Sequence, residues 1–159
     1  MMEADKKTVI LPMDQLIGLV QLQLSEKGSA SLVVTGNSML PIFRHMRDRV
    51  LLAPPENFKK GDIILYRRDD GKYVLHRILK KKDGYVICSG DNQWVTERVE
   101  DTWVLAVVTG FYKHSKQCSV TSKWYRLYKW VWVAFFPVRR PILWLGKKLF
   151  RLKNKLWGD

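Results

Sequence analysis

The middle of the chain, from residue 30 to about residue 115, alternates short apolar runs with Gly, Asp and Pro turn signals. The runs are rich in residues that favour a pleated strand. The expected strands are SLVVT (31–35), RVLLA (49–53), KKGDIILYRR (59–68), KYVLHRILK (72–80), YVICS (85–89) and TWVLAVVTGFYK (102–113). The stretch before the last of these is interpreted as a loop. The pattern predicts a mainly β domain over residues 30–120, with helices only at the two ends.

Residues 1–29 are interpreted as an N-terminal segment with one amphipathic helix. The helix is expected over residues 13–27, and Gly28 is expected to end it. Its apolar stripe at i, i+3, i+4 spacing consists of Leu16, Leu19, Val20 and Leu24. The first residues do not resemble a signal peptide, because acidic and polar residues interrupt the apolar positions.

Composition narrows the class of protein. Hydrophobic residues make up 47 % of the 159-residue chain, which is enough for a buried core. The two cysteines, Cys88 and Cys118, lack CxxC spacing, which argues against a disulfide framework and against a zinc site. No apolar run approaches the ~20 residues of a spanning helix. We expect a cytoplasmic chain that can be peripheral on the inner face of the membrane.

Residues 121–159 differ from the rest in charge and in aromatic content. They hold ten of the 28 Lys and Arg residues but one of the fifteen acids, and so carry +9 of the net +13 charge. Five of the seven tryptophans lie here, and Pro137 and Pro141 divide the segment. We predict a helical, basic tail that contacts an anionic membrane surface. The alternatives are helices packed on the β domain, a protein partner, and RNA bound by aromatic stacking; nucleic acid is not the partner that we favour.

Three segments stand out for chemistry: TGNSMLP (35–41), YVLHRI (73–78) and SGDNQ (89–93), with GDIILY (61–66) between the first two. In order and spacing they resemble the signal peptidase I family, in the branch that uses histidine where the common bacterial branch uses lysine. The resemblance covers residues 30 to 112. It implies a LexA/signal-peptidase-like β domain, in which Ser38 is the nucleophile, His76 is the base and Asp91 is the acid of the Gly-Asp-Asn segment.

The residues also make chemical sense without the family. A serine hydroxyl needs a base to accept its proton, and histidine can do this near neutral pH. Alternation along the strand puts His76 on an apolar face with Val74 and Ile78, unlike a solvated histidine. Asp91 would then orient the imidazole as in a triad. The structural alternatives are a turn serine, a satisfied core histidine and a turn-forming aspartate.

The expected function is that of a serine endopeptidase acting on a peptide or protein, such as a leader sequence, with no cofactor and no metal. Two alternatives stay open. One is a LexA-type self-cleaving regulator, although that branch generally uses lysine as base and carries a helix-turn-helix before the peptidase domain. The other is a non-catalytic binding module at the membrane surface with the same fold. The family's usual N-terminal membrane anchor is replaced here by the polar-faced helix over residues 13–27.

Overall fold

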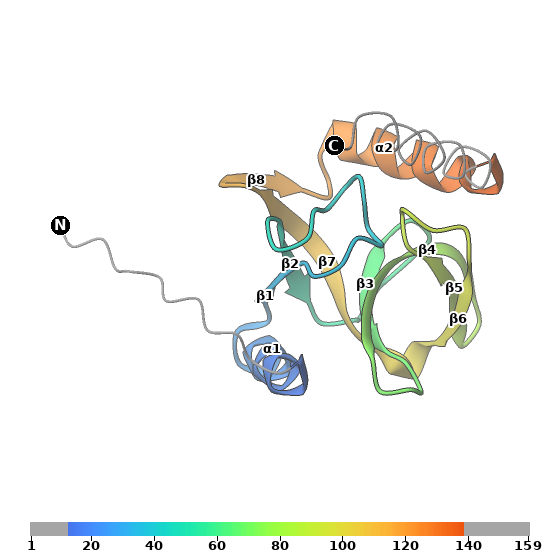
Figure 1. Cartoon of the computed structure of the whole chain (residues 1–159). Coiled ribbons are helices and arrows are strands. Elements are labelled where there is room, and N and C mark those ends of the chain that lie inside the picture. Colours follow the sequence, from blue (N-terminus) through green and yellow to red (C-terminus); the bar gives the residue numbers. More distant parts are fainter. Residues whose placement is uncertain (1–12, 139–159) are drawn as a thin grey trace, which may run out of the picture.

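The computed structural model describes residues 13–138 and shows one curled antiparallel sheet with a helix at each end (Figure 1). The strands are β1 (Ala30–Val33), β2 (Arg49–Ala53), β3 (Ile63–Arg67), β4 (Tyr73–Lys82), β5 (Tyr85–Ser89), β6 (Glu97–Glu100), β7 (Val104–Lys113) and β8 (Lys116–Ser119). They run in the order β1-β2-β7-β3-β4-β5-β6, and β8 pairs with β7. The prediction of a mainly β fold with terminal helices is confirmed.

Strand β3 separates two apolar cores. Ile63 and Leu65 belong to the larger core, which also receives β1, β2 and the loop between them, whereas Ile64 and Tyr66 belong to a smaller core shared with β4, β5, β6 and β7. Successive side chains of a strand point to opposite faces. The unbroken apolar run IILY is therefore what a strand buried on both faces requires.

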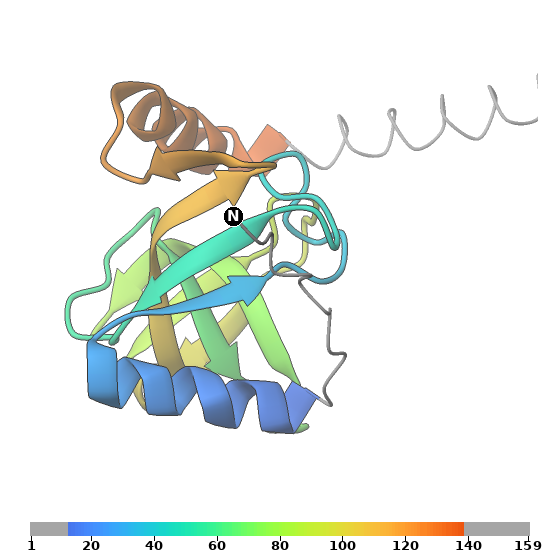
Figure 2. The same cartoon turned by 90° about the vertical axis from the view of Figure 1, so that its left-hand side faces the viewer.

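Helix α1 (Met13–Lys27) has the predicted bounds and packs on the larger core at one end of the sheet (Figure 2). Ile17, Val20 and Leu24 are its buried residues. Leu19, which the apolar spacing placed on the buried face, is exposed, because the contacting stripe runs through residues 17, 20 and 24. Gly28 ends the helix with φ 66°, and its N–H bonds to the Leu24 carbonyl at 3.0 Å.

Two short strands, β6 and β8, were not predicted from the sequence. β6 lies in the stretch that was interpreted as a loop, and β8 forms a hairpin with the end of β7. Three of the four residues of β6 are charged, so it lacks the apolar signature of a strand. It forms because its backbone pairs with β5 and because Val99 enters the smaller core.

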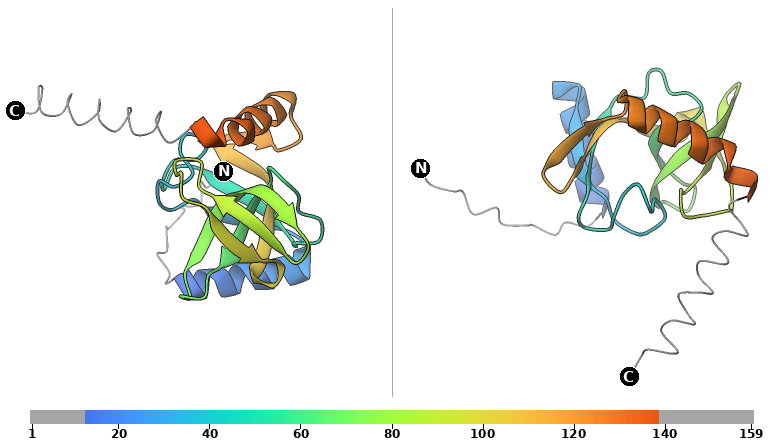
Figure 3. Two further views of the ribbon diagram at one scale, coloured as in Figure 1. Left: turned by 90° about the vertical axis from the view of Figure 1, so that its right-hand side faces the viewer. Right: turned by 90° about the horizontal axis from the view of Figure 1, so that it is seen from above.

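Helix α2 (Lys123–Ala134) lies at the other end of the sheet from α1 (Figure 3). Its one buried residue, Tyr125, joins the larger core. A 3-10 turn over Phe136–Val138 follows the helix and contains Pro137. The second helix that we expected in the tail lies outside the described residues. None of the described helices combines the length and the apolar character that crossing a membrane requires.

Candidate active site

The loop from residue 34 to residue 48 carries Ser38 and is fixed at both ends. Its two ends are joined where the Val34 N–H donates to the Asp48 carbonyl at 2.9 Å. The buried Asp48 carboxylate accepts hydrogen bonds from the Arg44 N–H and from the Arg47 guanidinium. Burial alone would raise the pKa of Asp48, but these donors outweigh it and lower that pKa. Met39, Ile42 and Phe43 anchor the loop in the larger core.

Ser38 is half-buried and lies against the turn after β5. Its carbonyl accepts a hydrogen bond of 2.7 Å from the Asn92 N–H, and the Asn92 amide donates to the Asn37 carbonyl at 3.2 Å. A Cβ atom built on Gly90 would lie 2.6 Å from the Ser38 carbonyl oxygen and 3.1 Å from the Ser38 Cβ. The serine loop can therefore take this position only because residue 90 has no side chain.

Gly90 directly follows β5, at the end of the pairing between β5 and β4. In the register of β4 and β5, Arg77 pairs with Ser89. One step further along the antiparallel pair, His76 faces Gly90. The residue against which Ser38 packs is thus the residue beside His76.

Alternation along the strands shows to which face of the sheet His76 and Gly90 are directed. Side chains two residues apart on a strand share a face, so His76 shares the face of Ile78, and Gly90 shares that of Cys88. Ile78 and Cys88 both belong to the smaller core. Register and alternation therefore direct His76, and the Gly90 position against which Ser38 packs, toward the same face of the sheet. Within residues 13–138 the hydrogen bonds of His76 go to Tyr66 and Glu97 and not to Ser38.

Glu97, at the start of β6, holds the imidazole of His76. Its Oε1 lies 2.7 Å from His76 Nδ1, and the Tyr66 hydroxyl lies 3.1 Å from the same nitrogen. Arg68 donates two hydrogen bonds to Glu97, of 2.6 and 2.8 Å. Register explains the position, because Glu97 pairs with Cys88 and therefore points to the same face as His76.

The charge on Glu97 fixes the protons of this cluster. Burial opposes ionisation, but the hydrogen bonds from His76, Arg68 and Tyr66 outweigh it and hold the pKa of Glu97 well below its usual range. An ionised carboxylate can only accept hydrogen bonds, so Nδ1 of His76 must carry the hydrogen. In the neutral ring Nε2 is then the acceptor. Burial, aided by the Glu97 charge, raises the pKa of Tyr66, so its hydroxyl keeps its proton.

Asp91, which the sequence analysis assigned to orient His76, has another partner. Its carboxylate receives Arg77 Nε at 2.8 Å and Arg77 Nη2 at 2.7 Å. Arg77 follows His76 on β4 and so points to the opposite face of the sheet. The motif reasoning identified a carboxylate near the site, but the structure gives the contact with His76 to Glu97. The only hint of this in the sequence was the alternation of Glu97 with the apolar Val99.

The sequence model of the Peptidase S24-like family matches residues 6–109, more than half of the chain. The chain belongs to the Peptidase S24-like family. This family is serine peptidase-like; it includes LexA-type self-cleaving proteins and signal peptidases, and it also contains inactive members. A comparison with curated proteins found no match.

The match to the Peptidase S24-like family ends before α2, yet α2 completes the Arg77–Asp91 cluster. The Tyr125 hydroxyl accepts a hydrogen bond of 3.2 Å from Arg77, and the Tyr128 hydroxyl donates to Asp91 at 3.1 Å. Trp132 Nε1 donates to the Asp91 carbonyl at 3.2 Å. Helix α2 therefore holds the same turn that, through Gly90, contacts Ser38.

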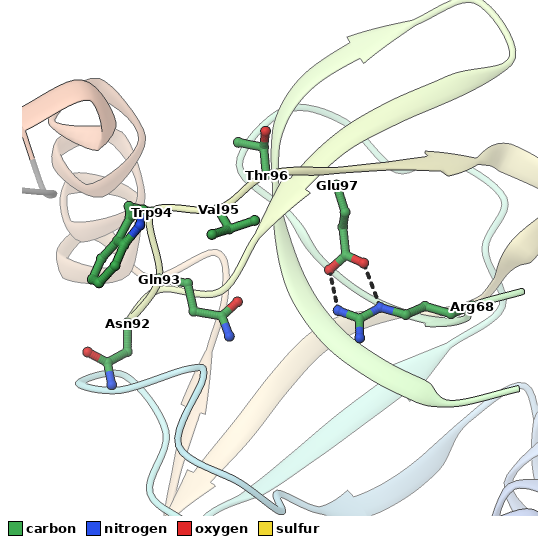
Figure 4. Close-up of a pocket in the computed structure, with 7 residues that line it drawn as sticks. All are labelled: Arg68, Asn92, Gln93, Trp94, Val95, Thr96 and Glu97. Carbon is green, nitrogen blue, oxygen red and sulfur yellow. Dashed lines mark hydrogen bonds and ion pairs between the residues drawn. The ribbon is translucent and has the colours of Figure 1, made fainter. Parts of the chain in front are cut away.

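A cavity of about 330 Å³ opens beside Glu97 (Figure 4). Residues 92–96, between β5 and β6, form one wall with the Trp94 ring, and the Arg68–Glu97 ion pair forms the other. Cys88, the cysteine nearest to this site, is no nucleophile, because burial and the negative Glu97 raise the pKa of its thiol to about 12. Ser38 is therefore the better candidate for the attacking group in this Peptidase S24-like chain.

Proposed function

We propose that the chain is a serine endopeptidase of the signal peptidase-like type, with Ser38 as nucleophile, His76 as general base and Glu97 as the residue that orients His76. The observation that carries the proposal is the 2.7 Å contact between His76 Nδ1 and the ionised Glu97. It sets the tautomer in which Nε2 accepts a proton, which is the state that a serine nucleophile needs.

Acylation begins when a substrate carbonyl reaches Ser38. The Ser38 hydroxyl gives its proton to His76 Nε2 while Oγ attacks the carbonyl carbon, and the resulting oxyanion needs a backbone donor, for which we assign the Ser38 N–H. Glu97 stabilises the imidazolium that forms. The imidazolium then protonates the leaving amine as the C–N bond breaks, and the acyl group stays on Ser38.

Deacylation reverses the proton path. A water molecule gives a proton to His76 Nε2 and attacks the acyl carbon, and the imidazolium returns a proton to Ser38 Oγ as the ester bond breaks. Within the described residues no hydrogen bond joins Ser38 to His76, so this scheme needs Oγ to approach Nε2 when substrate binds. Catalytic hydrogen bonds commonly tighten in this way in the substrate complex.

The proposed substrate is a peptide in extended form. The cavity of about 330 Å³ beside Glu97 has room for a side chain of such a peptide, and Trp94 and Val95 give it an apolar wall. The signal peptidase-like assignment rests on the His-Arg-Ile segment of β4. LexA-type proteins share the fold, but they generally use a lysine as the base. A peptide or a leader sequence is therefore proposed as the substrate ahead of the chain itself.

The test uses a peptide library of cellular origin, because such a library offers many different cleavage sequences at once. The full chain is incubated with the library, and new termini are identified by mass spectrometry. We expect a defined set of cleavages that Ser38→Ala and His76→Ala each reduce by about a thousandfold or more. Ser31→Ala, which changes an exposed serine on β1, is the matched control and should cleave like the wild type.

Two results would contradict the proposal. Cleavage by Ser38→Ala at the wild-type rate would mean that another nucleophile acts, and no cleavage by any variant would favour a non-catalytic module. Fragments of the chain itself in the same spectra, without cleavage of the library, would identify a self-cleaving regulator instead.

A further inference from the structure

Helix α2 has two unlike faces. Its inner face packs on the sheet through Tyr125, Tyr128 and Trp132, which bind Arg77 and Asp91. Its outer face presents Leu127 and Trp130, which are 63 % and 68 % exposed. Trp124, which is 47 % exposed, lies at the edge of this face, with its ring against Phe111. An amphipathic helix on a soluble domain normally turns polar residues outward. On α2 these large apolar residues are exposed beside Lys123 and Arg126.

Large exposed hydrophobic residues are concentrated in this part of the molecule. Of the eleven within residues 13–138, five lie between residues 124 and 138, and two of these, Phe135 and Val138, follow α2 in the chain. Scattered exposed apolar residues are normal, but a contiguous group of this kind marks a surface that contacts another body.

The charges around this face have one sign. Residues 121–138 contain Lys123, Arg126 and Lys129 and no acidic residue. Lys129 donates to Asp62 at 3.1 Å, so part of its charge is balanced within the molecule. By sequence, residues 139–159 add seven Lys and Arg residues against Asp159. The apolar face therefore lies within a basic part of the chain, which is complementary to an anionic surface.

A cavity of about 300 Å³ lies at the edge of the same face. It is lined by Lys60, Gly61, Lys129, Trp130, Val133 and Ala134. Gly61 has φ 89°, a conformation that favours glycine, and it lies against the Lys129 side chain. Its lining combines the charged Lys60 with the apolar Trp130 and Val133, a combination that suits a ligand with an anionic head and an aliphatic body, which is the chemistry of a phospholipid.

We propose that the outer face of α2 docks on an anionic lipid surface, with Trp124, Leu127 and Trp130 at the headgroup boundary and with Lys60 beside an anionic headgroup. Tryptophan and leucine next to lysine and arginine are the residues of interfacial helices. The inner face of the same helix binds Asp91, next to Gly90. Docking would thus hold the active-site turn within about one helix diameter, ~10 Å, of the lipid surface. The proposal does not depend on peptidase activity.

The test is co-sedimentation of the full chain with vesicles of phosphatidylglycerol and phosphatidylcholine in equal amounts, and with vesicles of phosphatidylcholine alone. The test variant is Leu127→Ser/Trp130→Ser. The matched control is Leu19→Ser/Leu22→Ser, which changes two similarly exposed residues on α1. We expect the wild type and the control to bind the anionic vesicles, and the α2 variant to bind about tenfold more weakly or worse. Salt should weaken the wild-type binding without abolishing it.

Several outcomes would overturn the proposal. Equal binding by the α2 variant and the wild type would show that another part of the chain, such as residues 139–159, makes the contact. Absence of binding by the wild type would reject a lipid partner. Two further measurements identify another partner of this face, when the α2 variant keeps its vesicle binding. Loss of RNA oligonucleotide binding would indicate RNA, and loss of a dimer in analytical ultracentrifugation would indicate a second copy of the chain. Thermal unfolding of all three proteins verifies that each is folded.

Discussion

Two adjacent residues of β4, His76 and Arg77, each bind a carboxylate, and the two pairs differ in their access to solvent. The Arg77–Asp91 side chains are both 0 % exposed, whereas those of His76 and Glu97 are 3 % and 23 % exposed. Burial would lower the pKa of Arg77, but Asp91 outweighs it and raises that pKa, so the sealed pair stays ionised. His76 is almost as buried as Arg77, so the difference in exposure lies at Glu97, which borders the cavity of about 330 Å³. The comparison therefore separates a fully buried ion pair from a pair that borders a cavity.

The largest effect is expected from Arg77→Met, which leaves Asp91 as a buried charge without its partner. Removing one member of a buried pair costs about 3–5 kcal/mol of unfolding free energy. Urea denaturation monitored by circular dichroism measures this loss. Arg98→Met, which breaks the exposed pair with Glu100, is the control and should cost less than about 1 kcal/mol. Similar losses in the two variants would mean that the Arg77 face of β4 is not the structural one.

Glu97→Gln tests the His76–Glu97 pair on the opposite face of β4 from Arg77. The amide keeps the size of the side chain but neither fixes the Nδ1–H tautomer of His76 nor stabilises the imidazolium, so peptide cleavage should fall by roughly a hundredfold or more. The library cleavage rate measures this. Asp91→Asn is the matched variant and, at temperatures where it stays folded, should lose less than about tenfold. The reverse order would restore Asp91 as the residue that supports His76.

Gly90→Ala tests the contact that brings Ser38 beside His76. A Cβ atom 2.6 Å from the Ser38 carbonyl oxygen must displace the serine loop or the turn. A displacement of ~1 Å can cost a hundredfold in rate, so we expect cleavage to fall between tenfold and about a hundredfold. Gly18→Ala on α1 meets no atom within 4 Å and is the control; it should leave cleavage unchanged and raise stability slightly. Full activity of Gly90→Ala would show that Ser38 does not depend on this turn.

The sequence was sufficient for the β3–β4–β5 region and insufficient for the partner of His76. Alternation along residues 73–78 placed His76 on an apolar face, and the Gly-Asp-Asn segment lies beside it as expected. Glu97 was missed because β6 is recognisable only through its pairing with β5, a contact between segments that local propensity cannot predict. The contact of Asp91 with Arg77 was also beyond the sequence, because the motif indicates proximity to β4 but not which of two adjacent, oppositely directed side chains Asp91 meets.

The same limit applies to α2. Helical spacing and Pro137 predicted the helix and its end, but the sequence did not show which residues face inward. Tyr125, Tyr128 and Trp132 bind a cluster formed by Arg77 and Asp91, two residues far away in the chain. Amphipathic spacing reports that a helix has two faces. Only the tertiary structure decides whether the sheet or another surface receives each of them.

The smallest expected effect is a pH dependence carried by Glu97. Hydrogen bonds lower the pKa of Glu97 in the folded chain, so the ionised carboxylate stabilises the fold. This contribution is complete above the ordinary pKa of the unfolded chain, ~4.3, and it is lost as the pH falls toward the lowered pKa. The difference in unfolding free energy between the wild type and Glu97→Gln should therefore shrink when the pH is lowered from about 5 to about 3. Urea denaturation at several pH values within this interval measures it, with Glu56→Gln, an exposed carboxylate, as the baseline. If the difference in unfolding free energy between the wild type and Glu97→Gln stays constant or grows over this interval, His76, Arg68 and Tyr66 do not hold the Glu97 carboxylate in its ionised form. The tautomer assigned to His76 would then lose its support.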